Sequence, residues 1–172
     1  MDGKQELPKR KHPRLNVFDY SSSGAYFITM CTHNRRCVFS RIAECEFFPS
    51  ERNALEYTKF GIIAEQQLLL LEERYSWLTV DKYVIMPNHI HAILVLNTET
   101  AETRSRPTLM DIVCAYKSLT VKECKKNGFA EKLFQVSFYE HIIRRKEDYD
   151  EIAKYICENP IRWQYDKLYV KG

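Results

Sequence analysis

The chain has 172 residues, of which 45% are hydrophobic and 28% are charged, and its formal net charge is +3. This length and balance predict one globular domain that buries about two-thirds of its unfolded surface, and they exclude a largely disordered protein. The longest apolar runs, such as 92–96, are far too short to span a bilayer, so we expect no membrane partner.

Cysteine usage and charge give two further expectations. The six cysteines form no CxxC pair, and the polar N-terminus lacks the hydrophobic core of a signal peptide. These features predict reduced thiols in a cytoplasmic protein. Basic residues gather at 4–14, 117–126 and 144–146. Such clusters can attract phosphates, although a solvated surface is the commoner interpretation of any one of them.

The first half of the chain begins with a polar segment. Residues 1–15 are predicted to form a flexible basic arm, and 16–172 a single domain. The segment 25–32, AYFITMCT, is rich in aromatic and β-branched residues and is therefore predicted to be the first strand. Asn53 is predicted to cap a helix that runs to about Arg74, because apolar residues recur there near helical spacing.

The rest of the chain alternates between apolar patterns and turn signals. Pro87 and Asn88 mark a turn between two strands of a hairpin, and Pro107 favours the first turn of a helix. The predicted elements are, in order, a strand over 77–86, a strand over 89–96, a helix over 108–126, a strand over 134–143 and a helix over 146–158.

This order of elements predicts the fold class. Strand, helix, two strands, helix and strand are typical of an α+β, ferredoxin-like βαββαβ sandwich, an antiparallel sheet with helices on one face. The final helix is additional to that unit. A fold of this kind does not by itself define a function.

The most informative segment is 83–96, YVIMPNHIHAILVL. His89 and His91 are two residues apart in the predicted strand, so their imidazoles lie on one face and can converge on one point. For an arbitrary HxH, two structural histidines at the mouth of a hairpin are the commoner explanation. Two neutral imidazoles also form a natural bidentate metal site, which leaves coordination positions for other residues.

The last predicted helix supplies candidates for those positions. Its buried stripe follows the i, i+3, i+4, i+7 pattern of Tyr149, Ile152, Ala153 and Ile156. Because each residue turns the helix by about 100°, Tyr155 lies roughly 110° from the centre of that stripe and is poorly placed to be core. Asn159 follows one turn later on the same face as Tyr155. A hydroxyl nucleophile and an amide oxygen, a candidate third metal ligand, therefore project side by side.

Three segments together carry a family resemblance: VIMPNHIHAILVL, the KS within AYKSLT, and FYEHIIRRKEDYDEIAKYICENPIRW. They resemble the single-tyrosine HUH transposases, in particular the REP-associated tyrosine transposases, over nearly all of 26–163. An HxH alone is a weak signal. The combination of MPNHIH with FYEHIIR and YIxxNP about sixty residues later is specific.

The resemblance implies a function and a set of roles. Proteins of this family have a ferredoxin-like catalytic domain and cut single-stranded DNA near small hairpins, forming a 5′-phosphotyrosine and releasing a 3′-hydroxyl. By this resemblance His89 and His91 hold a divalent metal, Tyr155 is the catalytic tyrosine on the C-terminal helix, and Asn159 is the third ligand. The implied partner is single-stranded DNA with a REP-like or element-end hairpin. The family includes monomeric and dimeric arrangements, the latter with the tyrosine helix exchanged between subunits, and of the two we expect a homodimer.

The identity of the metal is less constrained than its site. Imidazole ligands alone would favour zinc, copper or iron, whereas open positions filled by phosphate oxygens suit Mg²⁺ or Mn²⁺. The family implies Mg²⁺ or Mn²⁺, and we expect one of these ions.

Residues outside this constellation have weaker assignments. His141 is either a residue beside the metal ligands or a structural histidine, and Arg145 could pair with Glu147 or Asp148 instead of reaching DNA. Solvated surface is the alternative for every cation. The residues predicted to contact the DNA backbone are Lys117, Lys122, Lys125, Arg144 and Arg145.

Three functions compete on this evidence. The leading one is a transposase that nicks single-stranded DNA and transfers the strand. The second is a non-catalytic nucleic-acid-binding module with a ferredoxin-like fold. The third is a metal-dependent hydrolase in which a metal-bound water, and not Tyr155, attacks.

Overall fold

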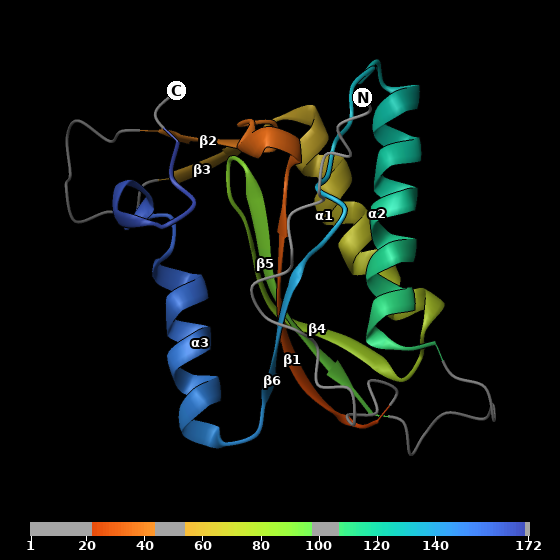
Figure 1. The fold of residues 1–172 in the computed structure, drawn as a ribbon, viewed down its shortest axis with the longest axis vertical. Helices are drawn as coiled ribbons and strands as arrows, with labels where there is room; N and C mark the ends of the chain where they lie inside the picture. Colours follow the sequence, from red (N-terminus) through yellow and green to blue (C-terminus); the bar gives the residue numbers. More distant parts are fainter. Residues whose placement is uncertain (1–21, 44–53, 98–106, 171–172) are drawn as a thin grey trace, which may run out of the picture.

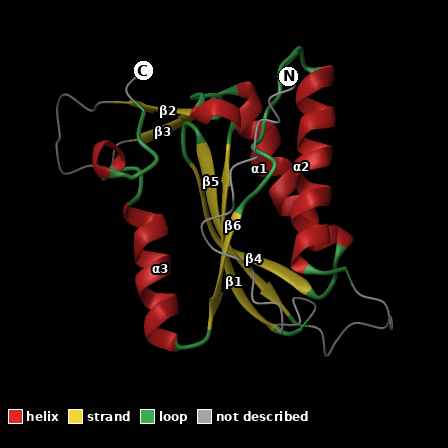
Figure 2. Cartoon of the chain, in the orientation of Figure 1, coloured by secondary structure: helices red, strands yellow, loops and turns green. Residues whose placement is uncertain are grey.

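The computed structural model describes residues 22–43, 54–97 and 107–170 (Figure 2). None of the helices in these ranges is both long and apolar enough to cross a membrane. The elements are β1 (Gly24–Cys31), η1 (His33–Arg35), β2 (Ser40–Ala43), β3 (Ala54–Tyr57), α1 (Lys59–Arg74), β4 (Leu78–Ile85), β5 (His89–Leu96), α2 (Leu109–Lys126), β6 (Tyr139–Ile143), α3 (Lys146–Glu158) and η3 (Trp163–Tyr165).

Four strands form an antiparallel sheet in the order β4-β5-β1-β6. Helices α1 and α2 cover one face of this sheet, and α3 lies on the opposite side (Figure 1). The order and the antiparallel pairing are those of a βαββαβ unit, so the predicted ferredoxin-like fold is confirmed.

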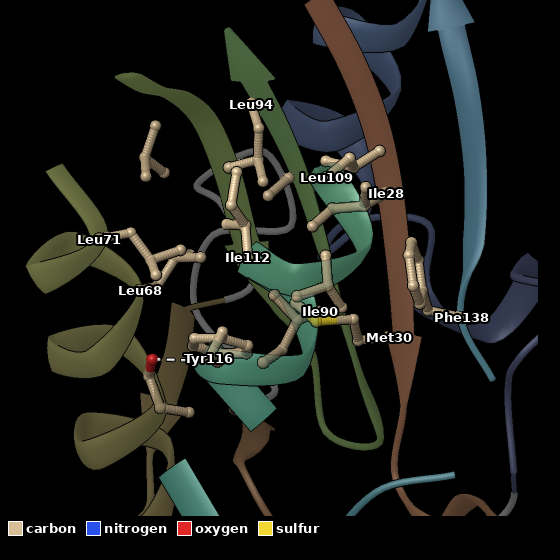
Figure 3. Close-up of a cluster of buried hydrophobic side chains, with 14 of the residues drawn as sticks. Ile28, Met30, Leu68, Leu71, Ile90, Leu94, Leu109, Ile112, Tyr116 and Phe138 are labelled. Carbon is tan, nitrogen blue, oxygen red and sulfur yellow. Dashed lines mark hydrogen bonds between the residues drawn. The ribbon is translucent and has the colours of Figure 1, made fainter. Parts of the chain in front are cut away.

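The sheet separates two apolar clusters because alternate residues of a strand point to opposite faces. The larger cluster joins Ile28 and Ile90 of the sheet to the buried faces of α1 and α2 (Figure 3). Tyr116 of α2 spans this layer, and its hydroxyl donates a 3.1 Å hydrogen bond to the carbonyl of Ala64 in α1. The smaller cluster joins Phe27 and Ile93 to α3. His89 and His91 share the second face with Ile93.

The start of the first helix differs from the prediction. Thr58 is the N-cap of α1, and its hydroxyl accepts hydrogen bonds from the backbone N–H groups of Phe60 and Gly61. The prediction of helix from residue 53 is wrong for 54–57, which pair with β2 as a short hairpin. Asn53, the predicted cap, and the predicted arm at 1–15 lie outside the described residues.

The fourth predicted strand is shorter than expected. Its ordered pairing with β1 begins at Tyr139, and Phe134 forms only an isolated bridge with Thr32. The segment between them turns around the Lys117 ammonium, which donates hydrogen bonds to the backbone carbonyls of 135–137. Because these three consecutive carbonyls point toward one group, the segment cannot be an extended strand. The predicted strands at 77–86 and 89–96 and the helices at 108–126 and 146–158 agree with the structure to within one residue at each end.

Candidate active site

The two histidines begin β5 and are both buried, at 0% and 3% exposure. Their rings lie 4.4 Å apart at an angle of 65°. In the register with β1, His91 is opposite Thr29 and His89 is opposite Cys31. The pair therefore lies at one end of a central strand, on the face toward α3, as the HxH spacing predicts.

Hydrogen bonds orient both rings. His89 Nδ1 lies 2.8 Å from Asn88 Oδ1, and the amide nitrogen of Asn88 donates to the carbonyls of Arg35 and Leu168 at 3.2 and 2.8 Å. Since an amide oxygen only accepts, His89 Nδ1 carries the proton and Nε2 keeps its lone pair. His91 Nδ1 lies 2.8 Å from the hydroxyl of Thr29. Both Nε2 atoms are thus left for the centre of the site.

Tyr155 reaches this centre from α3. Its hydroxyl lies 3.2 Å from His91 Nε2, and the two ring centroids are 5.1 Å apart. The side chain is 43% exposed, so its outer edge remains open to a substrate. Asn159, one turn further on, is 2% exposed at the end of the helix. The predicted convergence of the tyrosine, the amide and the two imidazoles is observed within one chain.

Asp166 completes the cluster and was not predicted. Its Oδ2 accepts hydrogen bonds from the Tyr155 hydroxyl at 2.9 Å and from the Asn159 amide nitrogen at 2.8 Å. Its Oδ1 accepts from the backbone N–H of Leu168 at 2.6 Å. One carboxylate oxygen of Asp166 and one nitrogen of each histidine all lie within 4.8 Å of one another.

Two buried atoms of the cluster have no hydrogen-bond partner in the described part of the chain: His89 Nε2 and Asn159 Oδ1. Buried polar atoms in folded proteins are nearly always paired, so this coincidence indicates a missing partner. Both atoms carry lone pairs and neither can donate, which fits a cation. The donor set of two imidazoles, an amide oxygen and a carboxylate therefore fits a divalent metal, and its two oxygens make it harder than the histidines alone.

Burial sets the protonation states of the site. It lowers the pKa of His89 to about 4, although the charge of Asp166 opposes the shift, and it lowers the pKa of His91 well below its usual range. Both imidazoles are consequently neutral at physiological pH, the form that binds a metal. Burial, followed by the charge of Asp166, raises the pKa of Tyr155. Tyr155 is therefore a phenol, which would have to lose its proton in order to act as a nucleophile.

No family model matches the chain. A protein of Haemophilus influenzae, described as uncharacterized, is 30% identical over 176 residues, which cover 94% of this chain and 93% of that protein. The two proteins belong to one family.

Among solved structures, a REP-associated tyrosine transposase bound to a REP hairpin matches with a TM-score of 0.57 at 19% identity, over 84% of this chain and 71% of that one. At this identity the likeness shows the fold. The chain thus has the fold of the transposases that its motifs resemble.

His141 lies in β6 and is exposed. It is in register with Phe27, whereas Tyr139 is the β6 residue in register with Thr29, the partner of His91. The β6 residue nearest to the candidate metal ligands along the strand is therefore Tyr139.

The residues predicted to contact DNA lie in two parts of the chain, three lysines in α2 and two arginines just before α3. The ammonium of Lys117 donates to the carbonyls of Gln135, Val136 and Ser137 at 2.9, 3.3 and 3.0 Å, so its three protons are engaged within the chain. Lys122 and Lys125 are exposed on α2, on the side of the sheet away from Tyr155.

The two arginines lie just before α3. Arg144 is exposed, and Arg145 forms an exposed 2.9 Å ion pair with Asp148, the alternative considered from the sequence. Arg145 is about 15 Å from Tyr155 along the helix, at 1.5 Å per residue. These arginines are therefore remote from the candidate nucleophile, although they remain open to the backbone of a longer DNA strand.

Proposed function

We propose that this chain is a metal-dependent single-stranded DNA endonuclease and strand transferase of the transposase type, which acts near DNA hairpins through a 5′-phosphotyrosine. The observation that carries the proposal is the 3.2 Å approach of the Tyr155 hydroxyl to His91 Nε2, beside the unpartnered His89 Nε2 and Asn159 Oδ1. A module that only binds nucleic acid has no need of a hydroxyl held against a buried metal-ligand cluster.

A divalent metal fits the site, with His89, His91, Asn159 and Asp166 as the residues that would hold it. When bound, a metal such as Mg²⁺ or Mn²⁺ supplies positive charge at the scissile phosphate and at the leaving oxygen. We favour these two ions because a carboxylate and an amide oxygen accompany the imidazoles.

The chain's own residues carry the bond changes. The Tyr155 oxygen attacks the phosphorus, and its proton passes to the Asp166 carboxylate, which already accepts the hydrogen bond of that hydroxyl. The bond from phosphorus to the 3′ oxygen breaks, and that oxygen takes up a proton from solvent to become a 3′-hydroxyl. Because the phosphotyrosine is still a phosphodiester, a DNA 3′-hydroxyl can attack it and rejoin strands without an external energy source.

One chain supplies every residue that this scheme uses. In a single copy, hydrogen bonds connect Tyr155 to His91 and Asp166, and Asp166 to Asn159, while the His89 ring lies 4.4 Å from that of His91. We therefore propose an active site that works in cis, and a homodimer would serve DNA pairing, not assembly of the site. The proposed substrate is single-stranded DNA with a hairpin, in line with the hairpin bound by the structural neighbour.

The test is a covalent adduct. The full chain is incubated with hairpin-bearing single-stranded DNA and Mn²⁺, with the label on the 3′ end in one reaction and on the 5′ end in another. On a denaturing gel we expect the 3′-labelled fragment to migrate with the protein and the 5′-labelled fragment to be released. Tyr155→Phe should abolish both products, whereas the matched control Tyr75→Phe, in a tyrosine at the end of α1, should retain them.

Other outcomes would identify the competing functions. Cleavage that survives Tyr155→Phe would show a hydrolase in which water attacks, and binding without cleavage would show a nucleic-acid-binding module. His89→Ala removes activity under both enzymatic schemes and cannot choose between them.

A further inference from the structure

A cavity of about 370 Å³ lies beside the candidate active site and is lined by residues of β2 and of the coil that follows α3. Its walls include three aromatic side chains, Trp163, Tyr165 and Tyr169, and two polar ones, Arg41 and Gln164. Pockets that bind small ligands begin at about 300 Å³ and combine an apolar lining with a few polar groups. The cavity meets both criteria, and none of the residues that line it in the described part of the chain takes part in the proposed reaction.

Aromatic ring contacts connect the wall of the cavity to the candidate metal ligand His89. The ring of Trp163 lies 5.8 Å from that of His89, and the ring of Tyr169 lies 5.2 Å from that of Trp163, edge to face. Asp166, which accepts the hydrogen bond of the Tyr155 hydroxyl, directly follows Tyr165 in the chain. A polymer whose phosphate lies at Tyr155 would therefore carry its neighbouring unit past this cavity.

The lining exposes aromatic surface that the fold does not use. Tyr165 is 88% exposed and Tyr169 is 37% exposed, with Ile161 beside them at 54%. Such a group of large apolar side chains at a pocket indicates a binding surface more strongly than scattered exposed residues do. Every nucleobase has a π-face that stacks on an aromatic ring, and stacking of this kind is the main apolar contribution to binding of single-stranded nucleic acid.

The polar groups of the lining suit the same ligand. Arg41 is exposed on β2 and carries a fixed positive charge that can pair with a phosphate or stack on a base. Gln164 is exposed and offers one amide that both donates and accepts, as the edge of a base requires. Among the described residues that line the cavity there is no carboxylate. This combination favours a nucleotide over a purely apolar ligand.

We propose that this cavity binds one unstacked nucleobase of the single-stranded DNA, adjacent to the scissile phosphate, with Tyr165 as its stacking platform and Gln164 at its edge. The cavity would thereby contribute to the choice of sequence at the cleavage site. This inference rests on the proposed function for the identity of the polymer. The lining of the cavity supports the binding of a base.

The test measures binding without cleavage. Hairpin oligonucleotides with single-stranded flanks are titrated with the full chain in the presence of a chelator, and fluorescence anisotropy gives the Kd. Each flanking nucleotide is replaced in turn by an abasic one. We expect one position at which loss of the base weakens binding roughly 5- to 100-fold, the range expected for one stacked base.

Variants link that position to the cavity. In Tyr165→Ala the same abasic substitution should have little further effect, because the base has already lost its platform, whereas Tyr165→Phe should behave as the unmodified chain does. Tyr165 is so exposed that the fold does not depend on it, and thermal unfolding of each variant checks this. Leu69→Ala, an exposed residue on α1, is the control and should leave the abasic profile unchanged.

The outcomes separate this inference from the proposed function. Hairpin DNA that binds with no position coupled to Tyr165 would overturn the base-binding cavity and leave the nuclease intact. A coupled position in a protein that never forms the covalent adduct would support the cavity and overturn the nuclease. Failure to bind any of the oligonucleotides would overturn both.

Discussion

The Tyr155 hydroxyl donates a 2.9 Å hydrogen bond to Asp166 Oδ2, and the same oxygen accepts from the Asn159 amide. This carboxylate joins the candidate nucleophile to a candidate metal ligand. Burial, and after it the charge of Asp166, raises the pKa of Tyr155, so the tyrosine stays a phenol until a substrate arrives. The carboxylate is then the nearest group that can take the proton.

The first prediction concerns this proton. In Asp166→Asn the side chain keeps its shape but cannot accept a proton, so we expect the rate of adduct formation to fall by about 10² to 10⁴, the usual contribution of a general base. Rates are measured by single-turnover assays on hairpin DNA at saturating Mn²⁺. Asp150→Asn, in an exposed carboxylate on α3, is the matched control and should retain the rate.

Asp166 is proposed both as the proton acceptor and as one of the residues that would hold the metal, and the same variant separates the two roles. If higher Mn²⁺ concentrations restore the rate of Asp166→Asn, the carboxylate contributes to metal affinity and another group accepts the proton. A rate that stays low at every Mn²⁺ concentration supports the role of proton acceptor.

The second prediction concerns the residue that orients His89. Asn88 is fully buried and links the His89 ring to the carbonyls of Arg35 and Leu168. In Asn88→Ala the ring loses the bond that fixes its tautomer, so we expect Mn²⁺ affinity to fall about 10- to 100-fold. Calorimetric titration with Mn²⁺ measures this. Asn97→Ala, just after the opposite end of β5, should bind Mn²⁺ normally, and equal affinities in both variants would contradict the assignment.

The third prediction separates two lysines of α2. Burial lowers the pKa of Lys117 to about 8, which still leaves the ammonium mostly charged at neutral pH, and its protons are engaged by three carbonyl groups. We expect Lys117→Met to lower the free energy of unfolding by about 2 kcal/mol, because the carbonyls lose a charged partner. Urea unfolding measures the change.

Lys122 is the matched partner in this comparison because it is exposed on the same helix. Lys122→Met should change stability by less than about 0.5 kcal/mol. If Lys122 contacts a DNA phosphate, its loss should reduce the slope of log K against log salt by about 1, whereas loss of Lys117 should leave that slope unchanged. If loss of Lys117 reduced the salt slope and loss of Lys122 did not, Lys117 would be the residue that contacts DNA.

Local periodicity accounts for what the sequence could predict. The two-residue spacing of His89 and His91 on a strand, and the one-turn spacing of Tyr155 and Asn159 on a helix, are local relationships that the chain cannot avoid once the elements form. Asp166 follows no such period. Its position depends on how the coil after α3 returns over the site, which is a tertiary property.

The β2–β3 hairpin escaped prediction for a different reason. Each of its strands has four residues, too few for alternation to stand out from an irregular segment. The apolar residues at 54–57 also continue the pattern of the following helix, so the helix was extended through them. Hydrogen bonding of Thr58 to the first turn of α1 is the local signal that marks the boundary correctly.

The fourth prediction is a pH dependence of stability. The pKa of His89 is about 4 in the folded chain against about 6.5 when unfolded, so between these values the unfolded state binds more protons. Stability therefore rises with pH across this window, and it is lost as the pH falls from about 6.5 toward 4. His91 acts in the same direction.

The measurement is urea unfolding of metal-free protein at several pH values between 7.5 and 4.5. The shift of His89 corresponds to a loss on the order of 3 kcal/mol at the acidic end. Since carboxylates titrate in the same range, the informative quantity is the difference in slope between the unmodified chain and His89→Gln, which should be shallower. Identical slopes would mean that His89 is readily protonated in the fold.

The fifth prediction concerns the contact that seats α1 against the β2 segment. A Cβ added to Gly61 would lie 2.0 Å from the carbonyl oxygen of Phe39, and that oxygen accepts a 2.9 Å hydrogen bond from the backbone N–H of Thr58. Neither the Phe39 carbonyl nor the Gly61 backbone can move away without disrupting the N-terminus of α1. We therefore expect Gly61→Ala to destabilise the protein by about 1 to 3 kcal/mol, despite a gain of about 1 kcal/mol in helix propensity.

Gly24→Ala provides the control for this contact. Its added Cβ would meet the Tyr26 ring at 3.6 Å, an ordinary van der Waals distance, so the change should stay within about 0.5 kcal/mol. Urea unfolding of both variants gives the comparison. If Gly61→Ala were as stable as Gly24→Ala, the helix could shift away from Phe39 at little cost, and β2, which lines the base-binding cavity, would not be held in position by α1.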